Sequence, residues 1–232
     1  MSDTDTGTET LENKLSSITL MRDNLKWRKI TQEGLDVDYT MLFSRSLSDM
    51  IMKNLDETVE YYTGKLAQVK VFGKLHPIPR LQAAYGDPEV RYEFSGISLM
   101  AKPWLPVLKL LRDVVENATG FHYNFVLINK YRDGNDHIGE HRDNEKEIDK
   151  KTPIASLTLG QQRTFVFRHG EARLKGKLKR ALASVKIELE CGSLLLMNPP
   201  TNKYWYHSLP PRKKLTGARI NLTFRNVVPC EK

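Results

Sequence analysis

The chain of 232 residues contains only two cysteines, Cys191 and Cys230. So few thiols exclude a scaffold held by several disulfides and a zinc module built on four cysteines, and they are typical of a reducing compartment. No apolar run reaches the roughly 18 residues of a transmembrane helix, so no membrane association is expected. The N-terminus lacks a basic segment followed by an apolar one and is acidic early on, so neither a secretory signal nor a mitochondrial transit peptide is expected.

The chain does contain an ordinary share of core-forming residues and an excess of positive charge. Hydrophobic residues make up 40% and charged residues 28%, as in soluble globular domains. Lys and Arg number 36 against 28 Asp and Glu, which gives a formal net charge of +8. This surplus favours polyanionic partners such as nucleic acid, although many basic proteins bind none, so charge alone leaves both classes open.

The N-terminal segment differs in composition from the rest of the chain. Residues 1–20 are rich in Ser, Thr, Asp and Glu and contain few large apolar side chains. Such a segment buries too little surface to offset the entropy lost on ordering, so we predict a disordered acidic tail, whose protein partner the sequence does not identify. Residues 21–232 show no repeat and no linker rich in Pro, Gly or Ser, and we predict that they form a single domain.

Helices are expected before strands within this domain. Apolar residues spaced by three and four predict helices at about 48–62 and 104–117, each followed by a glycine. Short apolar segments then predict strands at 123–131, 154–159, 164–167, 185–190, 193–197 and 219–225. This order indicates an α+β, mostly β fold, with an antiparallel sheet pair or barrel and N-terminal helices packed on one side.

A candidate metal site begins with His141 and Asp143. These residues place an imidazole and a carboxylate two positions apart, where an extended backbone points both side chains the same way. A surface ion pair in a polar loop is the simpler alternative. His207 supplies a second imidazole, and two histidines with one carboxylate on a β scaffold form the facial triad of non-haem Fe(II) oxygenases. Zn²⁺ also accepts these ligand types.

The segment 219–225 alternates between an apolar face and a polar face. Arg219, Asn221, Thr223 and Arg225 share the polar face, which in an ordinary strand faces water. Two arginines with Asn and Thr between them also suit a dicarboxylate, because guanidinium groups bind carboxylates bidentately. A zinc hydrolase has no need of a dicarboxylate co-substrate, so this strand favours iron over zinc.

Taken together, these motifs resemble the AlkB family of Fe(II)- and 2-oxoglutarate-dependent dioxygenases. The resemblance covers about residues 27–228 and depends on the order and spacing of Asn129-x-Tyr131, His141-x-Asp143, His207 and the strand 219–225. Further stretches are similar to a family member that repairs alkylated double-stranded DNA; they include Val71-Phe72-Gly73, Tyr92-x-Phe94 and the segment 205–210.

The resemblance implies a double-stranded β-helix, a form of jelly roll, in which the metal ligands His141, Asp143 and His207 bind Fe(II). The implied reaction couples decarboxylation of 2-oxoglutarate by O2 to hydroxylation of an N-linked methyl group, which leaves as formaldehyde. Arg219 would bind the distal carboxylate of 2-oxoglutarate. The rest of that pocket would be formed by Asn129, Tyr131, Asn221, Thr223 and Arg225, although Tyr131 could also be an ordinary half-buried strand residue.

The implied substrate is double-stranded DNA that carries alkylated bases, 1-methyladenine and 3-methylcytosine. The damaged nucleotide would be flipped out of the duplex, at a cost of a few kcal/mol. Val71, Phe72 and Gly73 would form the wedge that opens the base stack, although composition alone favours a core phenylalanine on a hairpin.

The flipped base would meet a second set of side chains. Phe94 would stack on the base, and Tyr92 and Glu145 would contact its polar edge; the alternatives are core aromatics of a sheet and a solvated acid. Asn144 stands where the similar family member has a second acid, which leaves the range of adducts open.

Two basic segments would contact the DNA backbone. The segment 168–186 contains seven Lys and Arg against one acid, and Arg212, Lys213 and Lys214 form a second patch. Both would bind phosphates without sequence preference, which is compatible with solvated, mobile loops. A monomer in the nucleus is expected from the resemblance and from the basic run 175–180. A demethylase of RNA or single strands, and a non-catalytic protein that binds damaged DNA, are the alternative functions.

Overall fold

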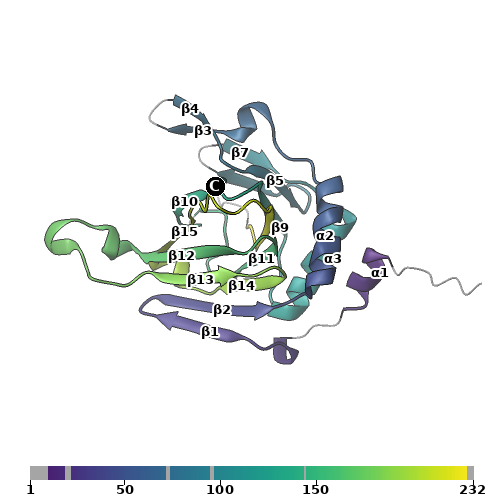
Figure 1. Cartoon of the computed structure of the whole chain (residues 1–232), viewed down its shortest axis with the longest axis horizontal. Helices are drawn as coiled ribbons and strands as arrows, with labels where there is room; N and C mark the ends of the chain where they lie inside the picture. The colour runs from purple at the N-terminus through teal and green to yellow at the C-terminus, as the bar shows by residue number, and fades with distance from the viewer. Residues whose placement is uncertain (1–9, 19–21, 72–73, 95–96, 144, 229–232) are drawn as a thin grey trace, which may run out of the picture.

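Two β-sheets face each other in this computed structural model, which describes residues 10–18, 22–71, 74–94, 97–143 and 145–228 (Figure 1). The larger sheet has eight strands, in the spatial order β1 (Arg28–Gln32), β2 (Leu35–Met41), β14 (Ser193–Met197), β11 (Ile154–Gly160), β16 (Arg219–Arg225), β9 (Phe125–Tyr131), β5 (Leu81–Gly86) and β8 (Lys102–Pro103). The smaller sheet has four, in the order β10 (Ile138–His141), β15 (Trp205–Leu209), β12 (Arg163–His169) and β13 (Val185–Leu189).

Helices lie against one face of the larger sheet, as Figure 1 shows. The α-helices are α1 (Leu11–Ser16), α2 (Arg45–Thr58), α3 (Pro106–Thr119) and the short α4 (Thr201–Tyr204); the 3-10 turns are η1 (Arg22–Asn24), η2 (Gly64–Ala67), η3 (Gly170–Arg173) and η4 (Gly176–Leu178). Two facing sheets with helices on one side confirm the prediction of a mostly β jelly roll. None of the helices in the described ranges has the length and apolar character needed to span a bilayer.

The central strands of the larger sheet are buried on both faces, which explains their apolar sequences. In β16, the side chains of Ile220, Leu222 and Phe224 pack against the helices. The polar face of β16 is also buried, and it points between the two sheets rather than into water. The same alternation holds in β9, where Val126 packs with the helices and Phe125 packs between the sheets. The polar residues of both strands therefore gather inside the sheet pair.

Helix α3 lies close to its predicted bounds, whereas α2 both begins and ends before the predicted residues. Ser44 caps α2 by accepting a hydrogen bond from the Leu47 amide, so the helix begins at Arg45, before the predicted start at about residue 48. The Ser48 hydroxyl lies within the helix and donates to the Ser44 carbonyl. Helix α3 ends at Gly120, whose φ of 77° is accessible to glycine without strain.

Two N-terminal features correct the sequence prediction. Residues 11–16, predicted to be disordered, form α1, because Leu11 and Leu15 on one side of this turn are buried beside α3. Residues 1–9 lie outside the described residues. Strands β1 and β2 precede the long helices α2 and α3 rather than follow them; β1 escaped prediction because it is polar and largely exposed at the edge of the sheet.

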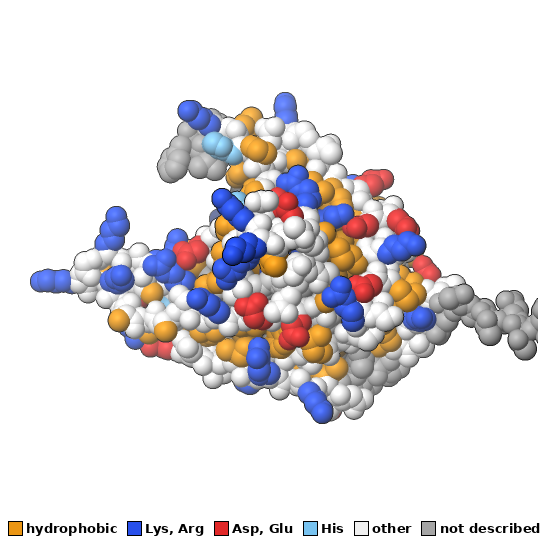
Figure 2. Space-filling view, in the orientation of Figure 1, with side chains coloured by type: hydrophobic (Ala, Val, Ile, Leu, Met, Phe, Trp, Pro, Cys, Tyr) orange, Lys and Arg blue, Asp and Glu red, His pale blue; other side chains and the backbone are white. Residues whose placement is uncertain are grey.

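Two projections extend from the same side of the sheet pair (Figure 1). One is the hairpin of β3 (Gln68–Val71) and β4 (Lys74–Pro77), and the other is the segment 170–184 between β12 and β13. Figure 2 shows a concave outline between them, with Lys and Arg side chains on both. A second hairpin is formed by β6 (Arg91–Phe94) and β7 (Ile97–Met100).

Candidate metal centre and anion pocket

The predicted metal ligands converge between the two sheets. His141 is the last residue of β10 and pairs with His207 of the adjacent β15, and Asp143 follows two residues after His141. The Asp143 Oδ1 atom lies 3.6 Å from His141 Nε2 and 3.8 Å from His207 Nε2. The described residues contain one group of three or more side chains able to hold a metal ion, and it is this one.

The protonation states of these ligands suit a metal ion. Burial lowers the pKa of His207 to about 3, so its imidazole is neutral near pH 7. Burial by itself would raise the pKa of Asp143, but the Arg225 guanidinium outweighs it and holds that pKa well below its usual value. A carboxylate and a neutral imidazole are the forms that bind divalent metals.

Neighbouring groups orient each ligand atom toward a common point. His141 Nδ1 lies 2.9 Å from the Gly139 carbonyl oxygen, so Nδ1 carries the proton and Nε2 presents its lone pair. Arg225 Nη2 donates to Asp143 Oδ2 at 2.6 Å, which leaves Oδ1 facing the histidines. The Phe165 ring stacks on His207, with centroids 5.3 Å apart. The triad is therefore held in place by the protein and fits a single ion.

Arg219 provides a buried positive charge at the start of β16, and it lies beside Tyr131, which lines the cavity of the triad. Its side chain is 2% exposed, and Nη2 donates to the Thr158 hydroxyl at 2.8 Å. Its guanidinium lies 5.3 Å from the centroid of the Tyr131 ring. Burial lowers the pKa of Arg219 to about 10, and no described carboxylate pairs with it. A buried guanidinium without a carboxylate favours an anionic ligand, because an unpaired buried charge is costly.

The amide of Asn129 is held in a defined orientation by two neighbouring side chains, those of Arg80 and Gln82. Its Oδ1 accepts hydrogen bonds from Arg80 Nε at 2.8 Å and from Gln82 Nε2 at 3.0 Å. An arginine can only donate, so the Asn129 atom that faces it must be the oxygen. The Nδ2 group of Asn129 therefore points away from Arg80 and Gln82 and can donate to a ligand in the cavity that Asn129 and Tyr131 line.

Gln82→Leu is expected to weaken 2-oxoglutarate binding about fivefold, because it removes one of the two hydrogen bonds that orient Asn129. The measurement is an anaerobic titration of the Fe(II)-loaded protein with 2-oxoglutarate, followed by its charge-transfer absorption. Gln161→Leu, which changes a glutamine outside this cavity, is the matched control and should leave the affinity unchanged. Equal affinities of the Gln82 variant and the unchanged protein would contradict the orienting role.

Other predicted pocket residues have protein partners of their own. Asn221 Nδ2 donates to Ser156 Oγ and to the Leu157 carbonyl, and its Oδ1 accepts from the Thr223 hydroxyl. Asn221 thus ties β16 to β11, and Thr223 holds the Asn221 amide in place inside the cavity that both residues line. Arg225, placed by the resemblance in the co-substrate pocket, contacts the metal ligand Asp143.

The predicted base and backbone contacts are only partly described. Phe72, Gly73 and Asn144 lie outside the described residues, as do the side chains of Val71, Tyr92 and Phe94, whose backbones belong to β3 and β6. Glu145 is half-buried in the loop after Asp143. The basic residues Arg212, Lys213 and Lys214 are exposed in the loop between β15 and β16.

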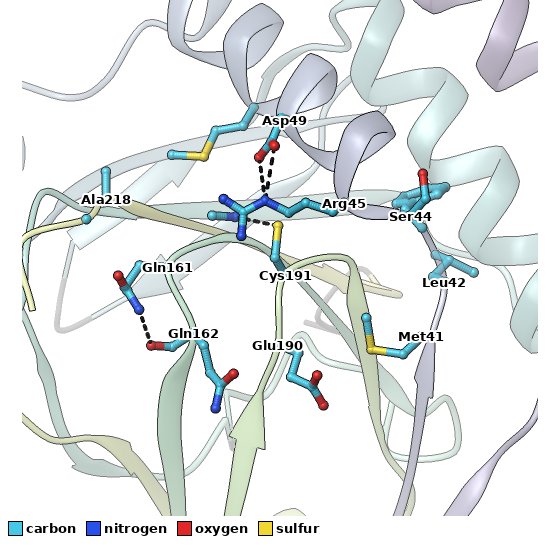
Figure 3. A pocket seen from close by; sticks show the side chains of 14 residues that line it. Met41, Leu42, Ser44, Arg45, Asp49, Gln161, Gln162, Glu190, Cys191 and Ala218 are labelled. Carbon is cyan, nitrogen blue, oxygen red and sulfur yellow. Dashed lines mark hydrogen bonds and ion pairs between the residues drawn. The ribbon is translucent and has the colours of Figure 1, made fainter.

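A separate hollow of about 940 Å³ lies away from the triad, at the turns that contain Gly160 and Cys191 (Figure 3). None of the predicted site residues lines it. Arg45 forms an ion pair with Asp49 there, and the Cys191 sulfur accepts a hydrogen bond from the Gly160 amide. Its charged and sulfur-containing groups thus already have partners, and the chemistry gathers at the triad.

Three further residues that line the cavity of the triad could not be identified from the sequence. Arg80, Phe165 and Met197 line the same cavity as the triad. No motif marks them, because each lies in an ordinary strand or loop and reaches the site through the pairing of distant strands.

Comparisons with known proteins agree with this geometry. A family model described as the 2OG-Fe(II) oxygenase superfamily matches residues 38–225. The Mus musculus protein named DNA oxidative demethylase ALKBH2 is 52% identical over 206 residues, which cover 89% of this chain and 86% of that protein. The Homo sapiens protein of the same name is 54% identical over 206 residues, which cover 89% and 78%.

Two further likenesses are more distant. The Rattus norvegicus protein named alpha-ketoglutarate-dependent dioxygenase alkB homolog 3 is 38% identical over 155 residues, which cover 66% of this chain and 52% of that protein. The solved structure of OsALKBH1 matches with a TM-score of 0.55 at 16% identity, over 87% of this chain and 99% of that one, and supports the fold alone.

Proposed function

The chain belongs to the 2OG-Fe(II) oxygenase superfamily, and from this premise we propose that it is a DNA oxidative demethylase that acts on alkylated bases. One observation supports the oxygenase chemistry above the others. Two imidazoles and one carboxylate converge in a cavity that Tyr131 also lines, and Tyr131 lies beside the buried Arg219, which has no carboxylate partner among the described residues. The name shared by the mouse and human relatives supports DNA as the substrate.

The chain's own residues would perform the binding and positioning steps. His141, Asp143 and His207 would hold Fe(II), and Arg219 would pair with the distal carboxylate of 2-oxoglutarate. With both groups bound, O2 and 2-oxoglutarate are converted to succinate and CO2 while an N-methyl group is hydroxylated and lost as formaldehyde. Arg225 keeps the Asp143 carboxylate ionised and binds its Oδ2 atom, so that Oδ1 remains available to the metal.

The proposal is tested with a duplex oligonucleotide that carries one 1-methyladenine or 3-methylcytosine. The protein is incubated with Fe(II), ascorbate and 2-oxoglutarate, and the mass of the oligonucleotide is measured. We expect the mass to fall by one methylene. An unchanged mass in a sample that shows the Fe(II)–2-oxoglutarate absorption would contradict the DNA substrate and leave the oxygenase site intact. Absence of that absorption would contradict the site itself.

A duplex is the substrate form that we propose, for two reasons. The hairpin β3–β4 and the segment 170–184 flank a concave face with Lys and Arg on both sides (Figure 2). The Val71-Phe72-Gly73 sequence connects the strands of that hairpin, where a wedge would meet the base stack.

Phe72→Ala should lower kcat/KM on methylated duplex by about 10- to 100-fold and change it by less than about threefold on a single strand, because a single strand has no stack to open. Both substrates are assayed with the same methylated strand. Leu75→Ala removes another apolar side chain of this hairpin, one that is 63% exposed, and is the matched control. Equal losses on both substrates would favour a single-strand or RNA demethylase.

A monomeric state and nuclear localisation are further parts of the proposal. They are supported by the resemblance and by the basic run 175–180, whose residues are exposed. Light scattering of the purified protein and imaging of a fluorescent fusion test them. A dimer, or a fusion spread evenly through the cell, would contradict the respective part.

A further inference from the structure

Arg163 is a buried arginine near the anion pocket, where its guanidinium lies 5.9 Å from the centroid of the Tyr131 ring. It begins β12, is 1% exposed, and pairs with no carboxylate in the described part of the chain. Its guanidinium donates instead to three backbone carbonyls: those of Asp133 at 3.1 Å, Asp136 at 2.9 Å and Pro210 at 2.9 Å. Burial lowers the pKa of Arg163, which reflects the cost of placing this charge inside the protein.

These carbonyls belong to two different loops. Asp133 and Asp136 lie in the loop 132–137 between β9 and β10, and Pro210 begins the loop 210–218 between β15 and β16. The side chain of Arg163 thus joins two loops that are far apart in the sequence. An apolar residue would fill this space without the cost of a buried charge, so stability alone does not explain an arginine here.

The two loops also bond to each other directly through Gly134. The Arg212 amide donates to the Gly134 carbonyl at 2.6 Å, and the Gly134 amide donates to the Leu215 carbonyl at 2.8 Å. A Cβ atom on Gly134 would lie 1.8 Å from the Arg212 carbonyl oxygen. Only glycine permits this approach, so any larger residue would force the loops apart.

The joined loops connect a cationic surface to the metal centre. The loop 210–218 carries Arg212, Lys213 and Lys214, all exposed. The loop 132–137 leads into β10, which ends at the ligand His141. Arg212 Nη2 also donates to the Thr164 hydroxyl at 3.2 Å, so the basic loop is bonded to β12 as well. The backbone that carries these cations is therefore held by hydrogen bonds against the loop that leads into β10.

We propose that Arg163 and Gly134 are positioning residues for the substrate, which hold the segment 212–214 where it meets the DNA backbone at a set distance from the metal centre. This inference rests on the proposed function. Phosphate contacts fix the register of a nucleic acid on a protein. A preformed cationic segment loses less conformational freedom on binding than a mobile one. It would also hold the DNA backbone at a distance from which the flipped base reaches the triad.

The test is a double-mutant cycle on DNA binding, read by fluorescence anisotropy with methylated duplex. Gly134→Ala separates the loops without changing any charge, and Lys213→Gln with Lys214→Gln removes the cations themselves. We expect each change to weaken binding about 5- to 20-fold and to reduce the slope of log Kd against log salt by about 0.9 for each phosphate that the protein no longer neutralises. Introduced together, the changes should weaken binding little beyond the lysine changes alone, because both act through the same phosphates.

Arg163 provides an independent second arm. Arg163→Met should reproduce the Gly134→Ala loss of DNA affinity, and Arg163→Lys should restore part of it, since an ammonium group still donates to carbonyls. Lys109→Gln, which removes an exposed charge on α3, is the matched control and should leave binding unchanged. Affinity for 2-oxoglutarate, measured for Gly134→Ala, should also stay unchanged.

Several outcomes overturn the inference. Full additivity of Gly134→Ala with the lysine changes, or an unchanged salt slope, would show that the loop junction does not act through these cations. Loss of 2-oxoglutarate affinity in Gly134→Ala would show a general structural role. If the unchanged protein binds methylated duplex yet demethylates none of it, the proposed function fails while the binding cycle still decides the inference.

Discussion

Asp143→Asn is expected to lower the demethylation rate by at least about a thousandfold, because the metal is deprived of the anionic ligand of its triad. Asparagine has the shape of aspartate but no charge, so the triad would keep its outline while its affinity for Fe(II) falls. Arg225 would then face a neutral amide in place of a carboxylate 2.6 Å away. The rate is measured as formaldehyde released from methylated duplex, and Fe(II) binding is measured by anaerobic titration.

A matched change far from the triad controls this experiment. Asp49→Asn removes a carboxylate that pairs with Arg45 in the separate hollow of Figure 3, and it should leave the rate unchanged. Retention of more than a tenth of the activity in Asp143→Asn would contradict a direct metal ligand. Equal losses in the two variants would show that the effect is not specific to the triad.

Arg219→Met should weaken 2-oxoglutarate binding by more than about a hundredfold while the protein stays as stable as before or becomes more stable. The substitution removes a buried, charge-assisted hydrogen bond to the co-substrate carboxylate, and such bonds contribute about 1.5–3 kcal/mol, or more when the partner is left buried. Methionine fills a similar volume without the cost of burying a charge, which explains the opposite effect on folding.

Two readouts separate binding from folding in this variant. The Fe(II)–2-oxoglutarate absorption gives the affinity, and thermal unfolding without added ligands gives the stability. Arg219→Lys should recover part of the affinity, because an ammonium group still pairs with a carboxylate but without the two-pronged geometry. A variant that binds 2-oxoglutarate normally would contradict the anion pocket, whatever its stability.

The pair of His141 and Asp143 could be predicted from sequence because its signal is a spacing of two residues, whereas His207 was assigned through the order of the motifs along the chain. His141 and Asp143 are two residues apart, and the pairing of β10 with β15 brings His207 opposite His141. The strand Arg219–Arg225 was predicted with its observed bounds, because its apolar and polar faces alternate without interruption. In both cases a short repeat or spacing encodes the geometry directly.

Features made by distant backbone contacts could not be predicted in this way. Arg163 and Arg80 look like ordinary polar residues in the sequence. Their roles depend on partners distant in the chain: Arg163 donates to the carbonyl of Asp136 in a loop, and Arg80 donates to the side chain of Asn129 in β9. Arg225 was predicted to line the co-substrate pocket; in the fold it lines the cavity of the triad, and its guanidinium also contacts Asp143, a partner that the sequence did not indicate. A pattern along one strand gives the face of a side chain but not the partner that lies opposite.

The outermost hairpin of the larger sheet has a consequence for self-association. Strand β2 covers β14 along its whole length, and β1 in turn covers β2. Without the hairpin, β14 would present an open edge formed by Leu194, Leu195 and Leu196, and edges of this kind recruit strands from other chains. The exposed Arg28 and Lys29 place charged side chains on the edge strand β1, which disfavours pairing with a strand of another chain. The hairpin is therefore expected to protect the protein against aggregation.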